Sequence, residues 1–194
     1  MAKKRKAKGW KHTLFIFILT FIVATVVGGI SIQVLNYTQL WVAVLILLLV
    51  ILLHVGFDVI GTAAMAATEP PHHARAAKKI MGAKQAIRLV KNADVVATFS
   101  NDIIGDVTST IGGAMATTII LVFIRQYPFM SAYEFWLNTL ILALVASLMV
   151  ASKAFSKTIA MQQANEIIGW VGKLMVVVEG LFPWRNREKK ERKN

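Results

Sequence analysis

The chain has no cysteine and few charged residues for its length. Because none of its 194 residues is cysteine, disulfide bonds and thiolate metal sites are excluded. Charged side chains make up 16%, whereas about a quarter is usual in a soluble domain. Residues 13–35 and 40–57 carry no charge at all. An uncharged run of about 18 residues or more can cross a bilayer as a helix. This distribution favours lipid, rather than a large protein core, as the surroundings of these runs.

Long apolar segments account for most of the chain. There are four of them, near Thr13–Leu35, Leu40–Ile60, Ile103–Ile124 and Trp136–Ser152. The first follows a basic start but is too long for a cleavable signal, so we interpret it as a retained helix. We therefore predict an all-α integral membrane protein with four transmembrane helices.

Two further segments are amphipathic. An apolar stripe bordered by lysines predicts a helix lying in the membrane surface, and it contains Ala76, Ile80, Ala83, Ile87 and Val90. Residues 158–182 are predicted as a second such helix, with a fifth span as the alternative. The basic residues that follow favour the interfacial position, because a fifth span would move them outside. The fold class is thus four spans plus interfacial helices on the cytoplasmic side.

Basic residues are concentrated between and beyond the apolar segments and give the net charge of +12. Along the chain, the non-membrane pieces hold 6, 0, 6, 1 and 9 lysines and arginines. Cytoplasmic pieces retain such residues, so this alternation predicts a plasma-membrane protein with both ends in the cytoplasm. We expect basic tails at residues 1–12 and 184–194 around a single transmembrane domain at 13–183. The expected partner of these residues is lipid and not nucleic acid.

Ionisable and amide side chains near the inner ends of the spans are the candidate functional residues. Asp58 lies 18 residues from Leu40, Asp106 lies 18 from Ile124, and Lys153 lies 17 from Trp136. At about 1.5 Å per residue, three helices should place these groups at one level. Carboxylate and amide oxygens are ligands that Mg²⁺, Ca²⁺ or Na⁺ accepts, so Asp58, Asn101 and Asp102 are the predicted metal ligands. Asp106, Ser109 and Lys153 are predicted to line the site or to act as counter-ions.

Structural roles are open alternatives for the same residues. Asp102 would cap the start of a helix, and Asp58 would form a structural pair with Lys153. The small residues of the third span, among them Gly105, Gly112 and Gly113, would only pack the bundle. His72 and His73 are predicted to be solvated, since no further ligands accompany them. There is no nucleophile–base arrangement, so we do not expect an enzyme.

Four weak motifs, in order, resemble the transmembrane domain of the CNNM/CorC (cyclin M) family of magnesium transporters. That family has F-S-G-S-E-T-A, G-A-x-x-A-x-x-L, G-N-N and G-E-x-x-P-K-T. Here the corresponding stretches are residues 57–63 (FDVIGTA), 82–89 (GAKQAIRL), 100–102 (SND) and 152–158 (SKAFSKT). The resemblance covers roughly residues 40–182, and the first span is additional.

The resemblance implies a homodimer and a Mg²⁺ site made by serine, asparagine and glutamate. Asn101 keeps the asparagine, whereas Asp58 stands at the serine position and Lys153 at the glutamate position. The ammonium of Lys153 can occupy the place of the ion, while the added Asp58 and Asp102 compensate in charge. We also expect the family's cytoplasmic CBS domains to be missing.

The sequence therefore predicts a divergent cation transporter or exchanger for Mg²⁺ or another divalent ion, with Na⁺ coupling as one option. The alternative is a non-transporting membrane adaptor or regulatory protein in which the Asp–Lys layer is structural.

Overall fold

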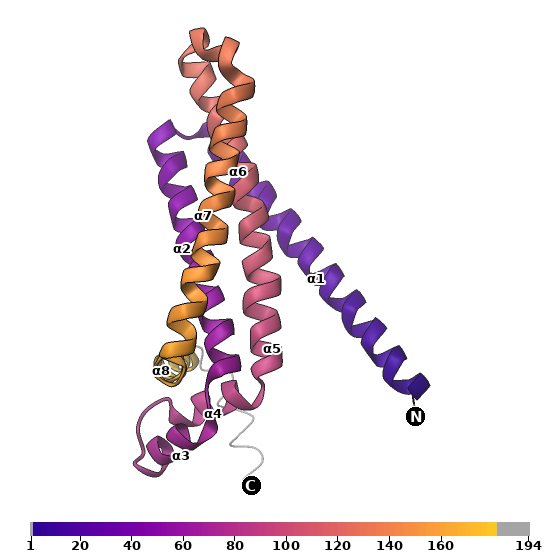
Figure 1. The fold of residues 1–194 in the computed structure, drawn as a ribbon, viewed down its shortest axis with the longest axis vertical. Coiled ribbons are helices and arrows are strands. Elements are labelled where there is room, and N and C mark those ends of the chain that lie inside the picture. Colours follow the sequence, from indigo (N-terminus) through magenta and orange to yellow (C-terminus); the bar gives the residue numbers. More distant parts are fainter. Residues whose placement is uncertain (1, 182–194) are drawn as a thin grey trace. The chain divides into compact units, whose positions relative to one another are not determined.

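The computed structural model describes residues 2–181, and within them every regular element is a helix. Figure 1 shows the labelled helices. In chain order they are α1 (Ala2–Tyr37), α2 (Leu40–Ala66), α3 (Glu69–Ala77), α4 (Ala83–Lys91), α5 (Ala93–Ala97), a π-helical segment (Thr98–Gly105), α6 (Asp106–Gln126), a 3-10 segment (Pro128–Tyr133), α7 (Glu134–Gln162) and α8 (Ala164–Leu181).

Four helical segments of the described chain are long and apolar enough to cross a membrane, as the sequence predicted. They are Thr13–Ile30, Leu40–Ala66, Ala93–Gln126 and Pro128–Gln162. Three extend beyond their predicted cytoplasmic ends, because polar residues there do not stop the helix. The third begins at Ala93 rather than near Ile103, since α5 and the π-helical segment lead directly into α6.

The chain divides into two compact units. Unit 1 consists of the chain up to Asp58 together with Ser100–Phe155. Its core is formed by side chains of α2, α6 and α7, such as Leu47, Ile111, Met115 and Met149. Within this unit α1 crosses α6, as Figure 1 shows. Many outward-facing side chains are large and apolar, for example Phe21 on α1 at 64% exposure.

Unit 2 consists of Val59–Phe99 and the chain from Ser156 onward. Its core is built mainly from alanines, with Ile168 of α8 fully buried among them. The face of α8 that carries Ala164, Ile168 and Gly172 is buried, and α8 packs against α4. Small side chains at this contact let the two helices approach closely.

The surface helix predicted to start at Ala76 is interrupted, and this prediction was wrong in extent. α3 ends at Ala77 and α4 begins at Ala83. Lys79 (φ 56°) and Gly82 (φ 84°) adopt left-handed backbone conformations in the intervening turn. Such a conformation is incompatible with a continuing right-handed helix, and glycine adopts it without steric cost. The apolar residues keep helical spacing across the turn, so the periodicity of the sequence did not indicate it.

α8 is a separate helix and is not among the four long apolar segments of the described chain. It begins after a break at Gln163 and carries Glu166, Lys173 and Glu179 within its length. Three charges in 18 residues are unfavourable for a helix surrounded by lipid. The predicted segment of residues 158–182 began too early, because residues 158–162 belong to α7; its interfacial position stays a prediction.

Candidate functional site

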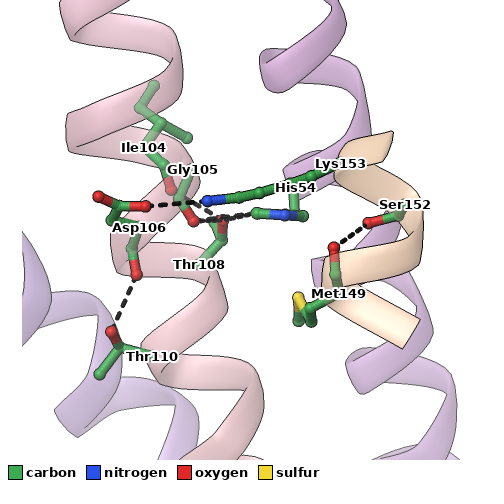
Figure 2. A network of polar contacts seen from close by, with 9 residues as sticks. All are labelled: His54, Ile104, Gly105, Asp106, Thr108, Thr110, Met149, Ser152 and Lys153. Atoms are coloured by element: carbon green, nitrogen blue, oxygen red, sulfur yellow. Dashed lines mark hydrogen bonds and ion pairs between the residues drawn. The ribbon is translucent and has the colours of Figure 1, made fainter. Parts of the chain in front are cut away.

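An ion pair joins α6 and α7 within unit 1. The ammonium of Lys153 lies 3.1 Å from Oδ1 of Asp106, and Figure 2 shows the two side chains extended toward each other. Their side chains are 41% and 64% exposed, respectively. The helix rise of about 1.5 Å per residue had placed these two groups at one level, and the structure brings them into contact.

His54, on α2, is a polar residue that the sequence reasoning missed. Its ring is fully buried, and Nδ1 lies 2.9 Å from the Gly105 carbonyl oxygen and 3.2 Å from Oγ1 of Thr108. A carbonyl only accepts hydrogen bonds, so Nδ1 carries the proton and donates. Nε2 has no hydrogen-bond partner among the described residues. A histidine inside an uncharged apolar run is costly to place in lipid. Its presence there in the sequence therefore already indicated a candidate functional site.

The π-helical segment Thr98–Gly105 holds the candidate residues Asn101 and Asp102. Its wider turn changes the backbone hydrogen bonding, and such segments are frequent at functional sites. At its end, the hydroxyl of Thr108 donates to the carbonyl oxygens of Ile104 (2.8 Å) and Gly105 (2.9 Å). Asp102 lies inside this continuous helix and is exposed, so the alternative that it caps a helix start was wrong.

The three predicted metal ligands differ in their surroundings. Asp58 is buried, with 6% exposure, and Asp102 is exposed. Asn101 is half-buried, and its Oδ1 is inaccessible to solvent and has no hydrogen-bond partner among the described residues. Asp58 and Asn101 therefore fit an inward-facing oxygen site better than Asp102 does. No group of three or more His, Cys, Asp or Glu side chains in residues 2–181 is placed to hold a metal ion.

The remaining candidates are Ser109, predicted to line the site, and the small residues of the third span. Ser109 is half-buried on α6. The small residues pack within the chain. A Cβ added at Gly112 would fall on the methyl group of Met149, and one at Gly113 would lie 3.8 Å from Leu142. These glycines make room for α7, as the packing alternative proposed.

We call His54, Asp58, Asn101, Asp102, Asp106 and Lys153 the polar layer. All of these residues belong to unit 1, and they come from α2, the π-helical segment, α6 and α7. The layer contains three carboxylates and one ammonium, and of the three carboxylates it is Asp106 that pairs with Lys153. Negative charge of this kind attracts cations and has oxygen atoms with which to bind them.

Comparison with known proteins adds no relative, since no family model, no curated protein and no solved structure matches this chain. The fold and the site therefore define a structural class and no particular family. It is an all-helical chain whose described part has four helices long and apolar enough to span a membrane.

His72, in unit 2, is fully buried, so the prediction that it is solvated was wrong; His73 is exposed as predicted. Burial lowers the pKa of His72 below its usual 6.5, and the Arg75 cation and His73 lower it further. The Glu166 carboxylate and the neighbouring side chain of Asn165 oppose this lowering of the His72 pKa.

The lowered pKa of His72 predicts that the protein loses stability in mild acid. Below about pH 6.5 the histidine of the unfolded chain binds a proton, whereas His72 of the folded chain does not yet do so. The free energy of unfolding therefore decreases as the pH is lowered. The loss stops at the lower, folded pKa. Thermal unfolding across this range should show the decline, and His72→Gln should remove part of it. His73→Gln is the control: it removes only the smallest cause of the lowered His72 pKa and should leave most of the decline in place. An equal effect of both variants would contradict the assignment.

Proposed function

We propose that this chain is an integral plasma-membrane protein that crosses the bilayer four times, with both ends in the cytoplasm. The support is the exposed apolar surface of the four long helices, including Phe21, Leu52, Leu144 and Trp136. Such a surface is unfavourable in water but natural in lipid. The alternating content of lysine and arginine in the connecting pieces supports the orientation.

We further propose that it transports cations as a divergent member of the CNNM/CorC type, with Mg²⁺ or another divalent ion as substrate. The observation that carries this proposal is the polar layer. It has a net negative charge, and the buried Oδ1 of Asn101 has no hydrogen-bond partner among the described residues. Ionisable groups within membrane spans are costly, and where they occur they often mark the pathway of an ion. The resemblance also supports a homodimer.

The contact between Lys153 and Asp106 suggests how the layer would work. An entering cation competes with the Lys153 ammonium for the Asp106 carboxylate, while Asp58 and Asn101 supply further oxygens. When the cation leaves, the ammonium pairs with Asp106 again. Lys153 would thus act as an internal counter-ion that pairs with Asp106 when the layer holds no cation.

Ion flux into proteoliposomes tests this function. Purified protein should carry Mg²⁺ faster than protein-free vesicles do, and Asp58→Asn should slow the flux by about tenfold or more. Each 1.4 kcal/mol of lost ion binding is a factor of ten, and the substitution removes a buried charge. Asp94→Asn, an exposed acid in unit 2, is the matched control and should transport normally. Background flux in the unaltered protein and in Asp58→Asn alike would remove the idea.

A non-transporting membrane adaptor is the second candidate, and the existing Lys153–Asp106 pair favours it. If the polar layer is purely structural, it binds no Mg²⁺, and added Mg²⁺ leaves the melting temperature unchanged. A ligand that binds only the folded state must stabilise it. A rise of the melting temperature with Mg²⁺, absent with an equal concentration of Na⁺, would therefore exclude the adaptor with a structural layer.

A further inference from the structure

Unit 2 contains a cavity of about 230 Å³ that is separate from the polar layer. Its walls come from α3, the turn after α3, the start of α4, and α8. The polar and aromatic residues of its lining are His72, Arg75, Glu166, Trp170 and Lys173. Cationic side chains that line a cavity attract anions and can donate charge-assisted hydrogen bonds to them.

Arg75 is held in place at the cavity wall. Its Nη2 pairs with Glu166, and its Nη1 donates to the Asn165 carbonyl oxygen at 3.4 Å. Gly169 leaves the space for the guanidinium, because a Cβ there would lie only 2.5 Å from Nη1 of Arg75. A guanidinium has five N–H donors, so donors remain after these two bonds. The guanidinium of Arg75 is thus held in position and still has N–H groups that can donate to a ligand.

Lys173 gives the cavity a second cation. Its ammonium lies 4.5 Å from the centre of the Trp170 ring, and it forms no ion pair with any acid of residues 2–181. Arg75 and Lys173 together outweigh Glu166 by one positive charge. His72 adds none while its pKa is lowered, but its buried ring lies at the wall. The cavity therefore has an unmatched positive charge and a fixed donor group.

We propose that this cavity binds a phosphate group, with Lys173 and Arg75 as its principal ligands. An arginine guanidinium held by two hydrogen bonds and a lysine ammonium beside it are complementary to a phosphate's several oxygens. The source of the group is an anionic phospholipid headgroup or free phosphate. The shared chemistry is a phosphate that has no ammonium of its own, because a choline or ethanolamine group would meet Arg75 and Lys173.

The rim of the cavity is apolar on its open side. Ile80, Met81 and Trp170 line it and are 43%, 53% and 67% exposed. Tryptophan beside basic residues is typical of the headgroup level of a membrane. A phospholipid could place its phosphate in the cavity and its glycerol and upper acyl chains on this rim, whereas free phosphate would use the cavity alone.

Thermal unfolding of the full-length protein in a neutral detergent tests the site. The probes are inorganic phosphate, with sodium chloride at equal ionic strength as its control, and a short-chain phosphatidic acid, with the matching phosphatidylcholine as its control. We expect phosphatidic acid to raise the melting temperature in a saturable way, and phosphatidylcholine to have no such effect. A similar rise with inorganic phosphate identifies the free anion as sufficient; a rise with the lipid alone identifies a headgroup site.

The variants keep the test falsifiable. Lys173→Gln should weaken the apparent affinity by about tenfold, as expected for losing one charge-assisted hydrogen bond. Gly169→Ala should weaken it by displacing the guanidinium of Arg75. Lys84→Gln removes an exposed lysine of the same unit outside the cavity and should bind normally. No saturable rise with either phosphate probe, or equal rises in Lys173→Gln and Lys84→Gln, would overturn the proposal. Ion flux plays no part in this readout, so its outcome is independent of the transport proposal.

Discussion

Replacing Gly172 with alanine is expected to separate α4 from α8 and to lower the melting temperature sharply. A Cβ at Gly172 would fall on the carbonyl oxygen of Gly82 and lie 3.0 Å from the amide nitrogen of Ala86. These neighbours are backbone atoms, so no side-chain rotation relieves the contact. Overpacking of this kind costs about 1–3 kcal/mol, and a rigid neighbour places the cost at the upper end.

The matched control is Gly180→Ala on the same helix. A Cβ there would have no neighbour within 4 Å. Alanine is the better helix former by about 0.5–1 kcal/mol, so this variant should melt at or slightly above the temperature of the unaltered protein. Thermal unfolding of both variants, with circular dichroism to verify helix content, makes the comparison. Equal melting temperatures would show that α4 and α8 do not approach as closely as described.

The long helices were predictable from the sequence because uncharged runs and helix length are local properties. The common level of Asp106 and Lys153 was predictable for a related reason. A helix rises by a constant 1.5 Å per residue, so counting from the outer ends places both residues at one level. Their ion pair at 3.1 Å was not predicted, because the sequence had offered Asp58 as the partner of Lys153.

Other features depend on tertiary contacts that the sequence does not display. The left-handed turn at Lys79–Gly82 brings the backbone of Gly82 directly against that of α8 at Gly172, and no periodicity reveals this contact. Burial of His72 likewise follows from the packing of α3 in unit 2. The π-helical segment inserts an extra residue into a turn without any distinctive composition.

His54 is different, because local information sufficed to find it. An imidazole between Leu53 and Val55 in an uncharged run needs a hydrogen-bonding partner if the helix crosses lipid. Asp58, one turn further along α2, lies on the same helical face, since residues four apart are neighbours.

Breaking the Lys153–Asp106 pair from either side is the second change with a large expected effect. Lys153→Met leaves the Asp106 carboxylate without this ammonium, and Asp106→Asn leaves the ammonium without its carboxylate. An uncompensated charge in a transmembrane helix costs about 2.5–3.5 kcal/mol at the bilayer centre and less near its edge. Each single variant should therefore be clearly destabilised, while the double variant, which has neither charge, should recover most of the loss.

The size of the coupling also reports on the surroundings of the pair. Both side chains are partly exposed, at 41% and 64%. An exposed ion pair in water is worth about 0–1 kcal/mol, because water screens it. The same pair facing lipid or a narrow polar cavity should couple more strongly, at about 1–3 kcal/mol. The double-mutant cycle thus distinguishes a pair within the membrane from one on a wet surface.

Equilibrium unfolding of the four proteins in bicelles or in a mild detergent–denaturant mixture gives the coupling energy. Lys157→Met is the matched control for the loss of a lysine, since Lys157 is exposed one turn further along α7. It should change stability little and show no coupling to Asp106→Asn. A coupling for Lys153 and Asp106 no larger than this control would place their charges in water. The polar layer would then not form part of a transmembrane pathway, because a transported cation would find no desolvated carboxylate there to compete for.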